Sequence, residues 1–291
     1  MAMTAYFRLM RLDKPVGIFL LWLPTAWALW IANQGYPPVS LVVYFALGTV
    51  LMRSAGCVVN DIADRHIDQH VQRTRLRPLT TGEVSLQAAL GLLFFLLLAA
   101  LLVLVNLPIA CFPYAVFAVA ITALYPFCKR FFQAPQFILG VAFSMGIPMA
   151  FVASAQAMTF EAWLLLAINF CWIVSYDTMY AMADKTDDLR VGIYSTAIWF
   201  GNYDYRIILL LQGMFQLLWL MLGGYLTDPA WFYMAWVLSN AVLGYQQFLI
   251  KTRNPKACFR AFQFSVCYGL IMWLGIWPYV ELTQRAHQLG Y

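Results

Sequence analysis

The chain has 291 residues, of which 63% are hydrophobic and only 11% are charged, with a net charge of +5. This composition excludes an ordinary soluble domain, and the unbroken apolar runs exclude a β-barrel, whose strands alternate in hydrophobicity. The positive charge does not indicate nucleic-acid binding, because most basic residues border the apolar runs and report membrane topology. The sequence therefore predicts an all-α integral membrane protein.

Nine apolar segments, broken by Pro, Gly and charge clusters, predict a bundle of nine transmembrane helices. They lie at about 16–33, 41–60, 84–105, 109–127, 136–154, 161–180, 207–226, 231–250 and 264–282. Only Asn106 and Pro108 separate the third segment from the fourth, which predicts a very tight turn. The two long connections, 61–83 and 181–206, each begin with acids and continue into basic residues, which suggests a pseudo-repeat.

Basic residues mark one side of the predicted bundle. Of the 18 Lys and Arg, 16 precede the first segment or follow the second, fourth, sixth and eighth segments. Arg53 lies inside the second segment, and Arg285 alone falls on the other side. Because cytoplasmic loops are enriched in Lys and Arg, we expect a cytoplasmic N-terminus and a periplasmic C-terminus.

The acidic residues are concentrated at two places, each at the end of an apolar segment. Seven of the 13 acids lie there, namely Asp61, Asp64, Asp68, Asp177, Asp184, Asp187 and Asp188. If the helices continue, Asn60, Asp61, Asp64 and Asp68 share an arc of about 100°, and Asp177, Asp184 and Asp188 share about 40°. Carboxylates beside hydrocarbon are costly, so the clustering predicts a divalent-cation site rather than two ordinary solvated loops.

Basic residues near both acidic groups change the expected ligand. These residues are Arg65, Arg73, Arg75, Arg77, Lys129, Arg130, Lys185 and Arg190. Carboxylates alone would repel a diphosphate, so the mixture of acids and bases fits a Mg²⁺–diphosphate site better than a bare cation site. Arg53 lies about two turns before Asn60 and either holds a substrate carboxylate or pairs with an Asp to fix the helix.

At these residues the sequence resembles the UbiA superfamily of intramembrane aromatic prenyltransferases. The resemblance is carried by residues 8–15, 53–68, 73–79, 125–130, 146–149, 176–188 and 192–196. It implies one prenyltransferase domain over residues 1–291, a bundle of nine helices with a lipid-facing portal, and an active site that opens to the cytoplasm. It also implies a multi-pass protein of the bacterial inner membrane.

The resemblance implies roles for individual residues. Asn60 would work with six carboxylates that hold Mg²⁺ and the polyprenyl diphosphate, namely Asp61, Asp64, Asp68, Asp177, Asp184 and Asp188. We expect Asp64 and Asp184 to be essential for catalysis, with Tyr125 and Tyr180 near the reacting allyl group. Basic contacts to the substrates carry over to Arg65, Arg73, Arg77, Lys129 and Arg130.

The stretch 176–184 favours 4-hydroxybenzoate as the acceptor, by resemblance, with prenylation ortho to its hydroxyl in a step of ubiquinone biosynthesis. Homogentisate, a naphthoate, a haem precursor or a chlorophyll precursor is the alternative acceptor. Arg53 and Arg130 are the candidates for binding the acceptor's carboxylate. A cation-coupled transporter is disfavoured because its acids would lie near the bilayer midplane, whereas these lie at segment ends.

Overall fold

The computed structural model of the protein describes residues 2–225 and 229–277. Its α-helices are α1 (Ala2–Leu9), α2 (Val16–Ala32), α3 (Val39–Asp64), α4 (Leu86–Leu104), α5 (Phe112–Cys128), α6 (Pro135–Ser144), α7 (Gly146–Ala153), α8 (Phe160–Val191), α9 (Thr196–Trp199), α10 (Asp204–Gly223), α11 (Pro229–Ile250) and α12 (Pro255–Ile276). Three short 3-10 turns are η1 (Asp68–His70), η2 (Ile109–Cys111) and η3 (Gly201–Tyr203). The described ranges contain no strand, so the all-α prediction is confirmed.

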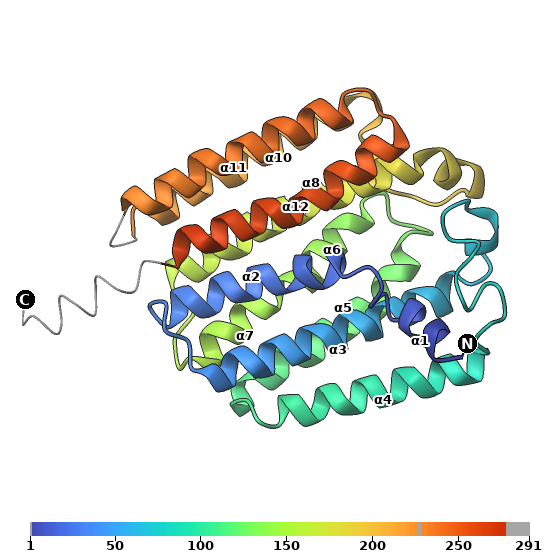
Figure 1. Cartoon of the computed structure of the whole chain (residues 1–291), viewed down its shortest axis with the longest axis horizontal. Coiled ribbons are helices and arrows are strands. Elements are labelled where there is room, and N and C mark those ends of the chain that lie inside the picture. Colours follow the sequence, from blue (N-terminus) through green and yellow to red (C-terminus); the bar gives the residue numbers. More distant parts are fainter. Residues whose placement is uncertain (1, 226–228, 278–291) are drawn as a thin grey trace, which may run out of the picture.

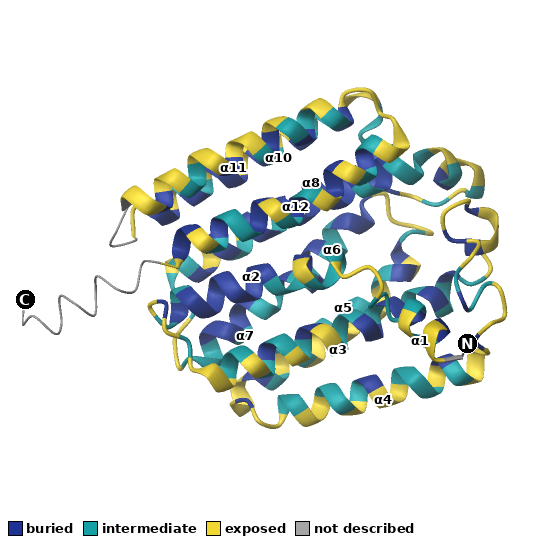
Figure 2. Cartoon of the chain, viewed as in Figure 1, coloured by how far each residue is buried: buried dark blue, intermediate teal, exposed yellow. Residues whose placement is uncertain are grey.

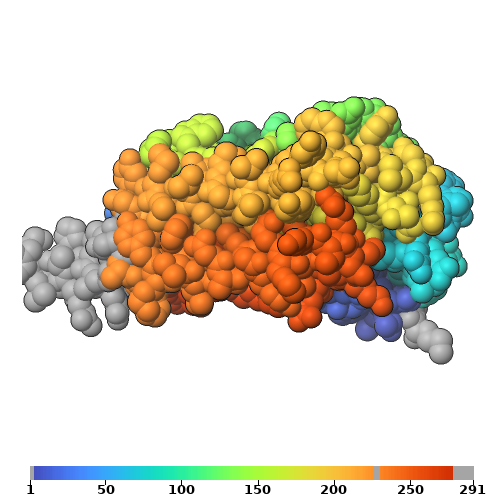
Figure 3. All heavy atoms as spheres, turned by 90° about the horizontal axis from the view of Figure 1, so that it is seen from above, coloured from blue at the N-terminus to red at the C-terminus, as the bar shows by residue number. Residues whose placement is uncertain are grey.

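The long helices lie side by side with roughly parallel axes, and the short helix α1 lies near one end of the bundle (Figure 1). Residues 65–85 and 192–203 lie at that same end, and Figure 3 shows these two connections close together. We call this end, formed by α1 and the two connections, the charged end. The acids of both groups therefore come to one end of the bundle, as the long connections predicted.

Seven helices of the described residues are long and apolar enough to cross a membrane, which agrees with the predicted integral membrane protein. They are Val39–Asp64, Leu86–Leu104, Ile109–Cys128, Pro135–Ala153, Phe160–Val191, Gly201–Gly223 and Pro255–Ile276. Two further helices lie where apolar segments were predicted. α2 is apolar but has only 17 residues, and α11 has 22 residues that include Gln246 and Gln247.

The helix ends differ from the predicted segments where polar residues continue or cap a helix. α12 begins at Pro255 rather than near 264, because the Asn254 side chain accepts hydrogen bonds from the amides of Lys256 and Ala257. The prediction of 264–282 was therefore wrong at its start, and residues 278–282 lie outside the described residues. The C-terminus, expected to be periplasmic, also lies outside the described residues.

The helices that carry the two acidic groups also end differently from one another. α8 continues through Asp188 to Val191 and ends at Gly192, whose φ of 77° suits the left-handed position that follows a helix. The assumption of a continuous helix is therefore confirmed for Asp177, Asp184 and Asp188. It is wrong for the first group, because α3 ends at Asp64 and Asp68 lies on the separate turn η1.

α8 lies at the centre of the bundle and α4 lies at its edge. Of the most apolar 18-residue stretch of each helix, 78% is buried inside the protein in α8, compared with 6% in α4 (Figure 2). α8 packs against α6, α10 and α12, and its Trp172 lies against Trp27 of α2. The second acidic group is therefore carried on the most buried helix, which keeps its side chains in place by packing.

Two ion pairs with the buried Asp204 fasten the C-terminal part of α8 to its neighbours. Asp204, at the start of α10, is fully buried and accepts hydrogen bonds from Arg253 at 2.8 Å and Lys185 at 3.2 Å. Lys185 follows Asp184 on α8, and Arg253 lies between α11 and α12. The two ion pairs therefore join α8, α10 and the α11–α12 connection beside the second acidic group.

Candidate active site

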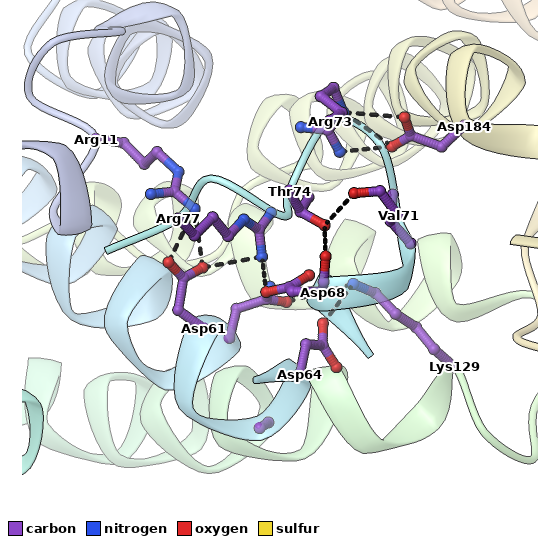
Figure 4. A network of polar contacts seen from close by, with 12 residues as sticks. Arg11, Asp61, Asp64, Asp68, Val71, Arg73, Thr74, Arg77, Lys129 and Asp184 are labelled. Atoms are coloured by element: carbon purple, nitrogen blue, oxygen red, sulfur yellow. Dashed lines mark hydrogen bonds and ion pairs between the residues drawn. The ribbon is translucent and has the colours of Figure 1, made fainter. Parts of the chain in front are cut away.

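The connection after α3 folds back over the end of the bundle (Figure 4). The Thr74 hydroxyl donates to the backbone carbonyl of Asp68 at 3.0 Å, which closes a loop between η1 and the residues that follow. The loop carries Arg73 and Arg77 to opposite sides of the site, Arg77 toward α3 and Arg73 toward α8. A loop with few apolar residues is held here by hydrogen bonds and ion pairs.

Two arginines hold the first acidic group. Arg11 binds both carboxylate oxygens of Asp61, at 2.8 and 3.0 Å. Arg77 lies 3.0 Å from Asp61 and 2.6 Å from Asp68, so it bridges these two acids. Burial raises the pKa of Asp68 above its usual value although Arg77 opposes the shift. Burial disfavours the charge of Arg77 itself, but Asp61 and Asp68 outweigh it and raise the pKa of the guanidinium.

A third arginine joins the first connection to the second acidic group. Arg73 binds Asp184 in a two-pronged contact, with Nε 2.9 Å from Oδ1 and Nη2 2.5 Å from Oδ2. The Arg73 guanidinium also lies over the ring of Tyr180, 4.6 Å from its centroid. The backbone amide of Gln72 donates to Asp187 at 3.1 Å. The structure thereby brings together Arg73, Tyr180 and Asp184, three residues that the sequence placed in one site.

Lys129 lies between the two halves of the site. Its Nζ atom is 3.3 Å from the side-chain oxygen of Asn60 and 3.4 Å from Asp64, and it lies 5.1 Å from the centroid of the Tyr125 ring. Its charge also interacts with Asp177 across the site. The end of α5 therefore supplies a cation and an aromatic ring to the space between α3 and α8.

The side chains of Asp177 and Asp188 form no hydrogen bond or ion pair with the described residues, although each residue is only 9% exposed. Asp177 interacts over a longer range with Lys129, Arg53 and Arg73. Asp188 interacts in the same way with Lys129 and Arg73, and is repelled by Asp184. Two buried carboxylates without a direct partner are costly to the protein alone.

Arg53 lies deeper in the bundle and is also without a polar partner. Its Nε atom is buried without a hydrogen bond, and no described residue forms an ion pair with it. The guanidinium lies 5.6 Å from the centroid of the Phe143 ring and against Gly17, where a Cβ atom would come within 2.4 Å of it. Arg53 lines an otherwise largely apolar cavity of about 530 Å³, to which each of the helices α2 to α7 contributes residues.

The structure does not bring Arg65 and Arg130 to these acids. Arg65 donates to the carbonyl of Ile62 at 2.9 Å, and Arg130 donates to the carbonyl of Ala63 at 2.8 Å. Both line a separate cavity of about 330 Å³ beside α4. The family resemblance implied that both contact the substrates, and both are neighbours of site residues in the sequence, but neighbouring residues on a helix point in directions about 100° apart.

The donors of the site fit Mg²⁺ that arrives with a diphosphate better than a bare cation. Among the described residues, no three His, Cys, Asp or Glu side chains converge on one point. Most of the acids are paired with Arg or Lys, which are themselves suited to phosphate oxygens. The unpartnered Asp177 and Asp188 offer the hard oxygens that Mg²⁺ prefers.

Sequence reasoning missed Arg11 as a site residue and counted it only as a topology signal. Arg11 precedes α2, and its φ of 58° is a left-handed conformation that non-glycine residues rarely adopt. Its guanidinium contacts Asp61, which is only 1% exposed. The available signal was its position in the stretch 8–15, one of those that carried the family resemblance.

Replacing Arg11 by Gln should destabilise the protein by about 1–3 kcal/mol, because the buried Asp61 loses one of its two cations. Arg8→Gln is the matched control in the same segment. Arg8 pairs with Glu83, but their side chains are 38% and 43% exposed, so we expect a loss of about 0.5 kcal/mol or less. Thermal unfolding in detergent measures both, and equal losses would show that the Asp61 contact adds nothing.

The fold and the site together define a class of protein. The chain is a multi-pass membrane protein of helical-bundle type whose acids, arginines and lysines meet at one end of the bundle. A family model described as the UbiA prenyltransferase family matches residues 21–274, and the chain belongs to this family.

Relatives and solved structures agree with this assignment. The chain is 58% identical over 273 residues to the 4-hydroxybenzoate octaprenyltransferase of Legionella pneumophila (strain Lens), covering 94% of this chain and 97% of the relative. It is 49% identical to the enzyme of the same name from Coxiella burnetii (strain Dugway 5J108-111), covering 94% and 96%.

Two solved structures share the fold at low sequence identity. A UbiA homolog from Aeropyrum pernix K1 superposes with a TM-score of 0.77 at 22% identity, covering 89% of this chain and 96% of that one. A UbiA homolog from Archaeoglobus fulgidus bound to GPP and Mg²⁺ gives 0.71 at 17% identity, covering 92% and 99%.

Proposed function

We propose that the protein transfers a polyprenyl group from polyprenyl diphosphate to the ring carbon ortho to the hydroxyl of 4-hydroxybenzoate, a step of ubiquinone biosynthesis. The observation that carries the proposal is the meeting of both acidic groups with Arg73 and Lys129 at the charged end. The names of the Legionella and Coxiella relatives support the choice of both substrates.

The basic residues would bind the diphosphate by exchanging partners. Arg73 and Lys129 now contact Asp184 and Asp64, and phosphate oxygens would replace these carboxylates. The released acids, with Asp177 and Asp188, would hold Mg²⁺, which neutralises charge on the leaving diphosphate. The Archaeoglobus structure with GPP and Mg²⁺ supports a divalent metal with an allylic diphosphate.

Two aromatic rings would face the carbon from which the diphosphate leaves. Tyr125 lies beside Lys129 and Tyr180 lies beside Arg73, so each ring adjoins a cation that would hold the diphosphate. A π-face stabilises developing positive charge on an allyl group. Phe259 and Phe262 pack against Tyr180 and would help to keep water from that side of the reacting carbon. The aromatic acceptor then attacks, and its ring proton passes to an Asp or to the diphosphate.

Arg53 would bind the carboxylate of 4-hydroxybenzoate, because its buried guanidinium lacks a partner and lies in the wall of the large cavity. The isoprenoid tail would occupy the apolar part of the same cavity, which α3, α4 and α5 line. Arg130 is exposed and faces the other cavity, so it is the weaker of the two candidates for the carboxylate.

The proposed protein is a single prenyltransferase domain over residues 1–291 with nine transmembrane helices in the bacterial inner membrane. α2 and α11 would complete the nine, since they lie in the bundle with the seven long apolar helices. The basic residues of the charged end support a cytoplasmic N-terminus and a cytoplasmic active site. The C-terminus would then be periplasmic.

Purified protein in lipid nanodiscs provides the test. It should form a prenylated product from labelled 4-hydroxybenzoate, a polyprenyl diphosphate and Mg²⁺, and removal of Mg²⁺ by EDTA should stop the reaction. Product from homogentisate or a naphthoate instead, with none from 4-hydroxybenzoate, would overturn the choice of acceptor. No product with any acceptor would overturn the reaction itself.

Gly17→Ala should raise the KM for 4-hydroxybenzoate by about tenfold, because misplacing a binding group by an ångström has effects of this size or larger. A Cβ atom there would lie 2.4 Å from Nε and Nη2 of Arg53, so the flexible guanidinium must move. Gly48→Ala is the matched control, since Gly48 lines the same cavity and its Cβ would meet nothing within 4 Å. Steady-state kinetics with varied acceptor distinguish the two variants.

A further inference from the structure

The cavity that contains Arg65 and Arg130 is separate from the site described above. It has a volume of about 330 Å³ and is lined by residues of α3, α4 and α5, together with Arg65 and His66. Within α3, its lining residues Val59 and Ile62 point away from Asp61 and Asp64, at roughly opposite positions around the helix. The proposed prenyl transfer makes no use of this cavity.

The wall of the cavity near the end of α3 is basic. Arg65 and Arg130 each use one hydrogen bond to hold a carbonyl near the end of α3, and Arg130 also lies 5.4 Å from the centroid of the Phe127 ring. A guanidinium has five N–H donors, so each arginine keeps donors that no described residue accepts. Exposed His66 lies beside them, and no acidic residue lines the cavity.

The floor of the cavity is apolar, and two of its residues, Leu90 and Phe127, are exposed at the surface of the bundle. Leu90 and Leu93 of α4 and Phe127 of α5 form the floor. α4 is the least buried of the long apolar helices, and its exposed Phe94 and Phe95 continue the apolar surface toward the bilayer. A basic wall above an apolar floor, at the edge of the hydrocarbon, matches an amphiphile with an anionic head.

We propose that this cavity binds the phosphate group of an anionic membrane phospholipid. Arg65 and Arg130 would hold the phosphate, with His66 at the exposed side. The acyl chains would lie along the exposed faces of α4 and α5. A free phosphate ion shares the head chemistry but would not use the apolar floor, so the two sources can be separated by experiment.

Native mass spectrometry of the purified protein tests the proposal, with dioleoyl phosphatidylglycerol and dioleoyl phosphatidylcholine as probes. The wild-type protein should retain phosphatidylglycerol in preference to phosphatidylcholine. Arg65→Gln/Arg130→Gln should weaken phosphatidylglycerol binding by about tenfold or more, as expected for two cations near a membrane surface. Arg206→Gln/Arg260→Gln is the matched control, because both arginines are exposed and lie over aromatic rings.

His66→Glu is a second variant that keeps both arginines and changes an exposed position, so it retains the hydrogen bonds to α3. The added negative charge should also weaken phosphatidylglycerol binding. Equal weakening in the Arg206/Arg260 control, or equal retention of the two lipids, would overturn the proposal. Displacement of the lipid by geranyl diphosphate with Mg²⁺ would assign the cavity to the substrate, and displacement by millimolar inorganic phosphate would assign it to a free anion.

Discussion

Asp177→Asn should lower kcat/KM for the polyprenyl diphosphate by about 100-fold or more, the size expected when one charged group that stabilises a reacting centre is removed. Asp177 lies on the most buried helix and has no hydrogen-bond or ion-pair partner among the described residues. Its charge is therefore available to a ligand. Asn has nearly the same shape, so the variant removes the charge while leaving the packing of α8 in place.

The dependence of the rate on Mg²⁺ distinguishes a metal ligand from a merely structural residue. If Asp177 binds Mg²⁺ with the diphosphate, the Mg²⁺ concentration for half-maximal rate should rise in the variant. The variant should unfold at a temperature no lower than the wild type, because it loses an uncompensated buried charge. Asp13→Asn is the control, since Asp13 is an exposed acid just before α2. Full activity with unchanged Mg²⁺ dependence would remove Asp177 from the proposed site.

The helices could largely be predicted from the sequence because hydrocarbon imposes a length and a composition on each of them. What the apolar pattern could not show is how polar residues extend a helix. α8 continues eleven residues beyond the predicted 180 because its charged end is packed among other helices and held through Lys185 and Asp204. The predicted segment 136–154 is also divided into α6 and α7. The division lies beside Gly146, which packs against Thr25 of α2, and such a contact between distant residues cannot be read from the apolar pattern.

The acids of the candidate site could be predicted because carboxylates are costly at the edge of hydrocarbon, so a cluster of them there indicates a functional site. Their partners could not be predicted from spacing. Asp61 pairs with Arg11, fifty residues earlier, and Asp184 pairs with Arg73, more than a hundred residues away. Arg73 was expected to contact the substrates, but not to pair with Asp184. Arg65 and Arg130, expected in the same role, line the separate cavity on the other side of α3.

Arg53→Leu should raise the KM for 4-hydroxybenzoate by about 100-fold, which is the effect of removing one partner of a buried, hydrogen-bonded charge pair. Arg53 has a buried Nε without a hydrogen bond and lies in the wall of the large cavity, so an incoming carboxylate would satisfy it. The KM for the polyprenyl diphosphate should change far less, since Arg53 forms no hydrogen bond or ion pair with the acids of the charged end and interacts with Asp177 only over a longer range. Kinetics with each substrate varied in turn give both values.

The same substitution should stabilise the protein in the absence of substrate. An unpaired guanidinium inside the bundle is costly, and replacing buried charge with apolar side chains has stabilised other proteins by about 1–4 kcal/mol. The contact of Arg53 with the Phe143 ring and its longer-range attraction to Asp177 offset part of that gain. Thermal unfolding without acceptor should therefore show a higher midpoint for Arg53→Leu, whereas addition of 4-hydroxybenzoate should stabilise only the wild type. If Arg53 instead held the helices together, stability and acceptor binding would both fall, so the opposite signs of the two effects identify a residue kept for its ligand.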